Sequence, residues 1–403
     1  MMEALEKHIT ENNILDMSQH GFRKKKSTST NLVQFWEKVT DISDSQCDVS
    51  IIYTDFMKAF DSVPHDLLLL KLEQYGITGR NLDWFRSYLN ERTQKVIVKD
   101  QLSEAINVES GIPQGGVLSG TLFALYINDV VTCFKKCEVS LYADDAKIFY
   151  AIENNASIAD VQEDLDNFSS WCDTWRIKLN VDKCFFLHHG QRIDSSQLIY
   201  KLNGIALKRE KSARDLGVII SDDLKWHLQT DEAVRKSKNQ VHIIRRTFKS
   251  RNAKFLTSVY KLHVCPHMEY CVEVWNPYHK GDIEKLEKVQ NMMTRLLPFG
   301  KVMSPSERNS YMNLPTHEDR RIRGDLIRTY QYIDNPQMFT VDTSYTRTGN
   351  GRKILTKYAR TDAKKYCLSG RTTKNWNNLS RKVVEAENVN EFKRLLDEEM
   401  KWP

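Results

Sequence analysis

The chain has 403 residues, with 59 Lys and Arg against 53 Asp and Glu, which gives a formal net charge of +6 at pH 7. This length suffices for two or three domains with substantial cores. The mild basic excess is compatible with a nucleic-acid partner but does not require one. No apolar run approaches the roughly 18 residues of a membrane span, and the amino terminus has no signal-like apolar segment. We therefore expect an intracellular protein with no membrane partner.

The eight cysteines are scattered along a chain too large to need disulfides, so we expect reduced thiols. His263, Cys265, His267 and Cys271 place four zinc-type ligands within nine residues. Their spacing does not match a zinc finger, in which two to four residues separate the ligands of each pair. The helical apolar pattern around them favours partly buried side chains over a zinc site.

Apolar residues at periods of two and 3.6 predict strands and helices in a mixed order. The expected elements are a helix over 1–20, a basic loop over 21–30, a helix to about 41, a strand over 49–55, helices within 65–90, a hairpin over 93–109, a turn at 111–116, helices over 117–131 and 157–178, and short strands at 184–189, 199–207 and 214–220. From about residue 230 onward the pattern is almost entirely helical. The fold class is therefore α/β (α+β).

Two adjacent acids, Asp144 and Asp145, separate two runs of alternating apolar residues, which predicts a hairpin with both acids at its tip. Asp is a favoured turn residue, but Asp55 ends a further strand. If the two strands are neighbours, three carboxylates converge. A pair about 4 Å apart repels by ~1 kcal/mol in water and ~4 kcal/mol at an effective dielectric constant of 20. Cations must neutralise such a cluster, and hard oxygen ligands favour Mg²⁺, as in two-metal phosphoryl transfer.

Asp55 and Asp144 lie 144 − 55 = 89 residues apart, with a Pro-Gln-Gly turn between them. Further motifs run the length of the chain, at residues 19–23 (Gln-His-Gly-Phe-Arg), 55–61, 111–115, 126–129, 142–145, 179–183, 216–218, 266–271 and 274–277. This ordered set resembles the reverse transcriptases of non-LTR retrotransposons of the jockey-like type.

The resemblance implies a right-hand polymerase fold with partial fingers, a mixed-sheet palm and a largely helical thumb and carboxyl-terminal region. Residues 1–225 would form the partial fingers and palm, and residues 226–403 the thumb and carboxyl-terminal region. The implied activity is RNA-directed DNA polymerisation, in which dNTPs are added to a DNA primer 3′-end on an RNA template. The family's target-primed mechanism implies action in the nucleus, although the chain carries no readable targeting signal.

Catalytic roles follow from the same resemblance. Asp55, Asp144 and Asp145 would hold two Mg²⁺ ions, with Mn²⁺ as an alternative, and Asp55 and Asp144 would be the direct ligands. Lys183 matches the family's lysine near the departing pyrophosphate and is a candidate general acid. A surface lysine after a strand is the alternative interpretation of Lys183.

Substrate contacts are also implied by the resemblance. The expected substrate-binding residues are Arg23, Phe56, Phe60, Gln114, Gly115 and Tyr142, and Leu216 with Gly217 would grip the primer. Phe60 would exclude a 2′-hydroxyl and so select deoxynucleotides. The alternative for Phe60 is a helix residue of the palm core.

The chain departs from the family pattern in three respects. Gly120 stands where the family usually has proline, and we expect a looser start of the following helix. The finger block expected before Gln19 and the endonuclease domain of complete elements are missing, so we expect a truncated copy. A catalytically silent or domesticated nucleic-acid-binding module is the alternative function. A maturase-like RNA-folding factor is disfavoured by the motifs at 266–271 and 274–277.

Overall fold

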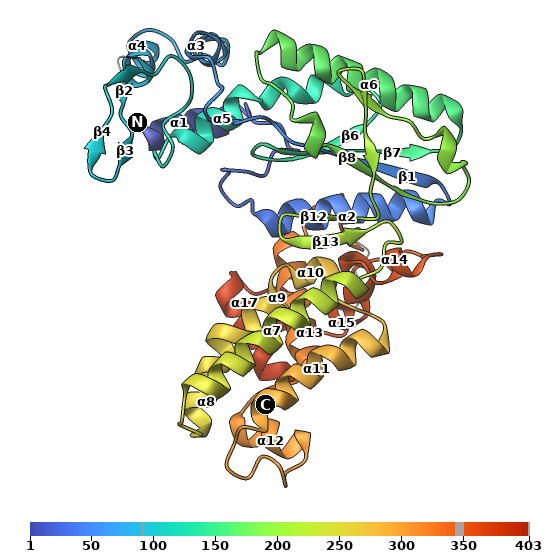
Figure 1. The fold of residues 1–403 in the computed structure, drawn as a ribbon. Coiled ribbons are helices and arrows are strands. Elements are labelled where there is room, and N and C mark those ends of the chain that lie inside the picture. The colour runs from blue at the N-terminus through green and yellow to red at the C-terminus, as the bar shows by residue number, and fades with distance from the viewer. Residues whose placement is uncertain (91, 343–349, 402–403) are drawn as a thin grey trace. The chain divides into compact units, whose positions relative to one another are not determined.

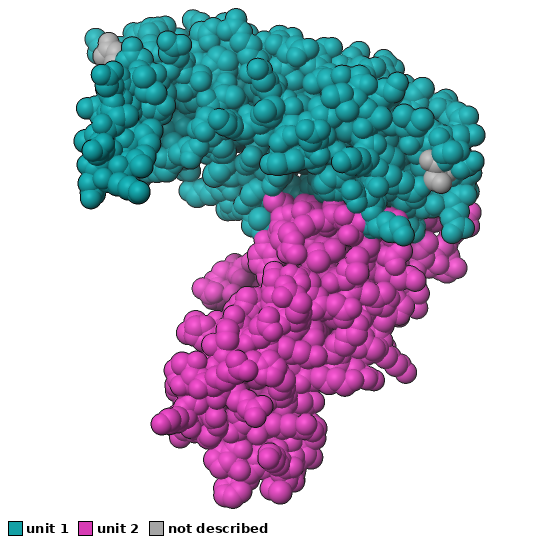
Figure 2. Space-filling model, viewed as in Figure 1, with its two compact units in different colours: residues 1–31, 47–211 teal, residues 32–46, 212–403 magenta. Residues whose placement is uncertain are grey.

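The computed structural model describes residues 1–90, 92–342 and 350–401 of the chain (Figure 1). The chain forms two compact units, one of residues 1–31 with 47–211 and one of residues 32–46 with 212–403 (Figure 2). Helix α2 (Thr28–Asp44) contributes residues to each unit.

The first unit is a mixed sheet with helices. Its elements are α1 (Met2–Glu11), β1 (Asp48–Thr54), α3 (His65–Gln74), α4 (Arg80–Leu89), β2 (Thr93–Gln94), β3 (Ile97–Val98), β4 (Gln101–Leu102), β5 (Ile106–Asn107), α5 (Ser119–Tyr126), β6 (Glu138–Tyr142), β7 (Asp145–Ile152), α6 (Asn155–Thr174), β8 (Phe185–His189), β9 (Lys201–Leu202), β10 (Ile205–Ala206) and β11 (Lys208–Arg209). Five strands pair in the order β11-β8-β1-β7-β6, with β1 antiparallel to both of its neighbours. Leu165 and Phe168 of α6 share one hydrophobic cluster with Ile148 and Ile152 of β7. The expected α/β class is confirmed.

The second unit is mainly helical, as the pattern after residue 230 predicts. Its elements beside α2 are β12 (Ser212–Asp215), β13 (Val218–Ser221), α7 (His227–Thr247), α8 (Ala253–Val259), α9 (Cys265–Glu269), α10 (Val272–Trp275), α11 (Lys280–Thr294), α12 (Pro305–Met312), α13 (His317–Tyr332), α14 (Asp362–Lys365), α15 (Leu368–Asn377), α16 (Arg381–Val384) and α17 (Val389–Met400). The β12–β13 hairpin joins this unit because the Ile219 N–H donates to Gln229 of α7 at 2.9 Å. The compact units therefore divide before residue 212, whereas we expected functional domains to divide after residue 225.

The amino-terminal helix is shorter than the sequence pattern predicts. Helix α1 ends at Glu11, and the segment up to residue 20 forms turns and a parallel bridge between Gln19 and Leu141. A helix over 1–20 would use the His20 N–H in its own hydrogen bonds, whereas this group donates to the Leu141 carbonyl here. The long-range pairing therefore overrides the local apolar period. The segment that carries the Gln-His-Gly-Phe-Arg motif is thereby tied to strand β6.

The expected helix over 117–131 is interrupted at Ile127. Helix α5 ends at Tyr126 and a 3-10 segment runs from Asn128 to Cys133. The buried Lys71 ammonium donates to the Tyr126 carbonyl and lies 2.5 Å from an Asp129 carboxylate oxygen. The Asn128 side chain donates to the Ile14 carbonyl at 2.8 Å. These distant partners take up polar groups at the helix end, which local periodicity does not reveal.

The expected strand over 199–207 is instead a hairpin of β9 and β10, which turns at Asn203 and Gly204 with positive φ at both.

Within residues 1–90, 92–342 and 350–401, no helix has the length and apolar character needed to cross a membrane.

Candidate active site

Asp144 occupies a two-residue turn between β6 and β7. Tyr142 pairs with Asp145 across the hairpin, so Ala143 and Asp144 form its loop. Ala143 has a φ of 54°, in the left-handed region that costs a residue with a Cβ about 1–2 kcal/mol. Positive φ at the first loop residue is typical of a type II′ turn, whose twist matches that of the flanking strands. The expected hairpin is confirmed, with Asp144 at its tip.

Asp55 reaches the same sheet edge because β1 and β7 are neighbours. Thr54 lies opposite Ala146 in the antiparallel register, so the residue after β1 stands next to the turn before β7. Burial raises the pKa of the Asp144 carboxyl, and the negative charge of Asp55 raises it further. The structure therefore brings these two carboxylates together, at the strand ends predicted from the sequence.

Asp145 lies differently from the other two acids. It is the first residue of β7 and is exposed, whereas Asp144 is half-buried. Adjacent residues of an extended chain point to opposite sides. In the part of the chain that the structure describes, no three His, Cys, Asp or Glu side chains form a group that could hold one metal ion. Asp145 stays a predicted ligand beside the Asp55–Asp144 pair.

The Asp55 carboxylate has one strongly exposed cationic neighbour. Lys183 Nζ lies 3.3 Å from Asp55 Oδ2, and the lysine side chain is 67% exposed. This contact is an ion pair without hydrogen-bond geometry, since Asp55 Oδ2 is buried and accepts no hydrogen bond from the described residues. The Asn180 N–H donates to the Asp55 carbonyl at 2.8 Å, which holds the 179–183 motif beside the acid. A buried carboxylate oxygen without a donor is suited to a cation.

The Phe60 ring contacts two other aromatic rings. It stacks on Phe123 with ring centroids 4.5 Å apart and meets Phe22 edge to face at 6.0 Å. A Cβ built on Gly120 would lie 2.1 Å from the Phe22 ring. A side chain at position 120 would therefore displace the Phe22 ring, whereas the sequence suggested only a looser helix start. Phe60 is half-buried, so the ring lies at the border between core and surface.

Phe56 directly follows Asp55 in sequence, and Tyr142 stands two residues before Asp144. The Phe56 side chain is 6% exposed and meets Phe168 edge to face at 6.0 Å, which makes it a core residue. Its ring is therefore not available to a substrate, contrary to our expectation for Phe56. Tyr142 is half-buried at the last position of β6 and has the access that a substrate contact needs.

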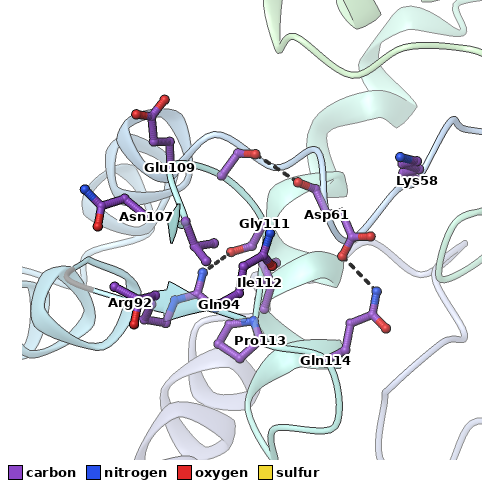
Figure 3. A pocket seen from close by; sticks show the side chains of 13 residues that line it. Lys58, Asp61, Arg92, Gln94, Asn107, Glu109, Gly111, Ile112, Pro113 and Gln114 are labelled. Atoms are coloured by element: carbon purple, nitrogen blue, oxygen red, sulfur yellow. Dashed lines mark hydrogen bonds between the residues drawn. The ribbon is translucent and has the colours of Figure 1, made fainter. Parts of the chain in front are cut away.

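Gln114 borders an open pocket of about 820 Å³ in the first unit (Figure 3). Its side-chain amide donates to Asp61 at 2.8 Å, which links the 111–115 turn to the 55–61 motif. On the far wall, Arg92 donates to the Gly111 carbonyl at 2.6 Å. Gly115 has a φ of 80°, and a Cβ there would meet no atom within 4 Å, so its backbone is accessible. Both predicted residues thus border open space.

Arg23 lies in the loop after the parallel bridge. Its guanidinium donates to the Asp16 carbonyl at 2.6 Å, and burial lowers its pKa. This contact closes the loop of residues 16–23 on itself. An expected triphosphate contact by Arg23 would have to replace or supplement this bond.

Leu216 and Gly217 form the turn of the β12–β13 hairpin in the second unit. Both residues have positive φ, of 43° and 89°. The Tyr270 hydroxyl donates to the Leu216 carbonyl at 2.8 Å, and a Cβ on Gly217 would lie 3.0 Å from the Tyr270 ring. Tyr270 thus supports the turn that we expected to grip the primer. Sequence reasoning singled out the 266–271 motif but not this role.

The histidines and cysteines of the 263–271 segment do not share one environment. Cys265 and Cys271 are buried, His263 is exposed and His267 is half-buried. Burial raises the pKa of the Cys265 thiol to about 12. The eight cysteines form no disulfide in the described part of the chain.

A chain of hydrogen bonds between buried polar side chains near the Asp144 turn was not predicted from the sequence. Lys147 of β7 is 1% exposed and donates to Asn31 at 2.6 Å. Asn31 donates in turn to the Ser140 hydroxyl at 2.9 Å and to the Leu141 carbonyl at 3.0 Å. The available signal was a lysine within the apolar run of β7, because a buried charge needs partners.

Residues 1–256 match the family described as reverse transcriptase (RNA-dependent DNA polymerase), and the chain belongs to that family. It is 24% identical over 310 residues to a probable RNA-directed DNA polymerase from transposon BS of Drosophila melanogaster, across 72% of this chain and 33% of the relative. It is 25% identical over 283 residues to the RNA-directed DNA polymerase from mobile element jockey of the same organism, across 68% and 31%. The expected jockey-like kinship is confirmed.

The chain spans about a third of the length of these curated relatives. Among solved structures, it is similar to telomerase from Candida tropicalis in complex with a TWJ fragment of telomeric RNA. That similarity has a TM-score of 0.44 at 12% identity and covers 83% of this chain and 54% of the other.

Asp144→Asn is expected to stabilise the metal-free protein at pH 7. The pKa of Asp144 is raised in the folded state, so its ionisation above the unfolded-state pKa costs folding free energy. Asparagine removes that cost, and the gain should shrink as the pH falls toward about 4, where an unfolded aspartate takes up its proton. Urea unfolding in EDTA measures the effect, with Asp100→Asn in an exposed turn as control. A destabilised Asp144→Asn protein at pH 7 would contradict this explanation.

The effect of Gly120→Ala should depend on Phe22. In the wild-type background the new methyl group meets the Phe22 ring and should cost about 1–3 kcal/mol of unfolding free energy. In a Phe22→Ala background the three atoms nearest to the new methyl group are gone, and the same substitution should cost less. Denaturant unfolding of the two single variants and the double variant gives the coupling energy. Equal effects of Gly120→Ala in both backgrounds would rule out the contact.

Proposed function

We propose that this chain is the RNA-directed DNA polymerase part of a non-LTR retrotransposon protein. It would extend a DNA primer with dNTPs on an RNA template. The observation that carries the proposal is the pair of carboxylates at one sheet edge, with Asp144 in a strained hairpin turn beside Asp55 at the end of β1. Membership of the reverse transcriptase family supports the reaction class.

Reverse transcriptases generally use divalent metal ions, and Asp55 with Asp144 are the residues that would hold them. When bound, two Mg²⁺ ions, or Mn²⁺ in their place, would activate the primer 3′-hydroxyl and neutralise the triphosphate. Magnesium sites commonly use one or two carboxylates together with substrate phosphates. Two acids therefore suffice here, and the exposed Asp145 would act from outside the direct ligand set.

Lys183 would supply a proton to the departing pyrophosphate. Its ammonium already stands 3.3 Å from Asp55 Oδ2, at the edge of the acid pair, and its side chain is exposed enough to move toward a phosphate. A positioned ammonium can act both as a general acid and as a counter-charge for the leaving group.

The nucleotide would lie between the acid pair and the aromatic rings. Phe60 would exclude a ribose 2′-hydroxyl, and Tyr142 and the backbone at Gly115 would also contact the nucleotide. Gln114 and Arg23 are now engaged with Asp61 and the Asp16 carbonyl, so their substrate contacts would need these bonds to exchange.

The second unit would hold the template–primer duplex. Leu216 and Gly217 would contact the primer end, and the basic helices would track phosphates without reading the sequence. Nuclear action and an endonuclease elsewhere in the whole protein remain predictions from the jockey-like kinship.

Primer extension on poly(rA)/oligo(dT) with Mg²⁺ tests the proposed function. The wild type should extend the primer, and Asp144→Asn should be slower by about a thousandfold or more, because the metal ions supply several kcal/mol. Template–primer affinity should be unchanged, since phosphate contacts dominate binding. Asp100→Asn is the matched control in an exposed turn of the same unit. Wild type that binds template–primer without extending it would instead indicate a silent binding module.

Phe60→Ala should admit ribonucleotides. Removal of the ring opens space for a 2′-hydroxyl, and the preference for dNTP over rNTP in kcat/KM should fall by about tenfold or more. Phe299→Ala, which removes an exposed ring of the second unit, is the control. If Phe60→Ala keeps the wild-type sugar preference, Phe60 is a core residue only.

A further inference from the structure

The segment from Ser18 to Gly21 pairs with β6 through one parallel bridge, between Gln19 and Leu141. The Leu141 N–H donates to the Ser18 carbonyl at 3.0 Å, and the His20 N–H donates to the Leu141 carbonyl at 2.9 Å. These bonds hold Gln19 beside the strand that leads into the Asp144 turn. The segment is therefore fixed by backbone pairing, independently of the Gln19 side chain.

Gln19 Oε1 accepts two backbone hydrogen bonds at the turn. The Gly21 N–H donates to it at 2.7 Å and the Ala143 N–H at 3.0 Å. The residue is 0% exposed. The amide orientation follows from its partners, because a flipped amide would face two donors with its own donor group. Each N–H would be a buried orphan without this oxygen.

The Gln19 bond is made to the strained residue of the turn. Ala143 carries the positive φ of 54°, a conformation that persists in a non-glycine residue only when its surroundings impose it. Gly21 lies against the same atoms, since a Cβ there would be 2.3 Å from the Ala143 nitrogen. The hydrogen bond to Gln19 and the close approach of Gly21 together restrict the orientation of the Ala143 amide.

We propose that Gln19 is a positioning residue for divalent-cation binding. It holds Ala143 in the left-handed conformation that presents Asp144 to Asp55, and it thereby sets the affinity of the acid pair for its metal ions. The inference rests on the proposed function, because it takes Asp55 and Asp144 as the metal ligands. Gln19 touches neither the substrate nor the ion.

Mn²⁺ binding, followed by electron paramagnetic resonance on the full chain, tests the proposal without requiring turnover. Gln19→Ala should weaken Mn²⁺ binding about tenfold, the equivalent of losing the two hydrogen bonds that fix the turn. Ser18→Ala is the matched control, because the Ser18 hydroxyl is buried and has no hydrogen-bond partner among the described residues. It should bind Mn²⁺ as the wild type does.

A second substitution separates positioning from general structural support. Glycine adopts positive φ without steric cost, so Ala143→Gly in the Gln19→Ala background should recover most of the Mn²⁺ affinity. A role in overall folding would not be restored by a change in the turn. Melting temperatures of all variants, measured by circular dichroism, show whether each variant is folded.

If Gln19→Ala does not fold, hydrogen–deuterium exchange of the wild type decides. The Ala143 amide should exchange slowly, as a bonded amide does, and fast exchange would overturn the proposal. Unchanged Mn²⁺ affinity in a folded Gln19→Ala protein would overturn it as well. If the wild type itself binds no Mn²⁺ and extends no primer, the proposed function fails and the inference fails with it. If only Gln19→Ala loses Mn²⁺ affinity and Ala143→Gly restores it, the results support both the proposed function and the positioning role of Gln19.

Discussion

The antiparallel pairing of β1 with β7 is the constraint on which the site depends. Its register sets Thr54 opposite Ala146, so that Asp55 and the Asp144 turn emerge at one sheet edge. Two carboxylates held there repel each other, and burial adds to the cost of ionising Asp144. The sheet core supplies the free energy that keeps them together. A cation that bridges the acids would turn this unfavourable contact into a favourable one.

The residues around the acid pair offset the free-energy cost of holding two carboxylates together. Ala143 is held in a strained conformation by bonds from the Gln19 segment, and Lys147 with Asn31 anchors the strands beneath. On the other side, the Lys183 ammonium partly balances Asp55. Functional sites are commonly less stable than the rest of a fold, and here each supporting contact joins two residues more than 100 positions apart in sequence.

The structural elements that depend on local sequence pattern could be predicted. The Asp144 hairpin, strand β1 with Asp55 after it, and the helical second half follow from apolar periods, and the family follows from the order of the motifs. Apart from the approach of Asp55 to Asp144, long-range contacts could not be predicted. The Asn128 bond to Ile14 shortens an expected helix, the Phe22 ring explains Gly120, and Phe56 turns out to be buried. The role of Asp145 stays a prediction, because sequence adjacency does not say which way each side chain points.

The most direct measurement is a crystal structure with template–primer, a non-reactive dNTP analogue and Mn²⁺, in which anomalous scattering locates the metal. We expect Mn²⁺ within about 2.2 Å of carboxylate oxygens from both Asp55 and Asp144, close to the distance typical of small divalent ions with oxygen ligands. We expect Asp145 outside the direct ligand set. Metal at other side chains, or none at the Asp55–Asp144 edge with nucleotide bound, would show that Asp55 and Asp144 are not the metal ligands.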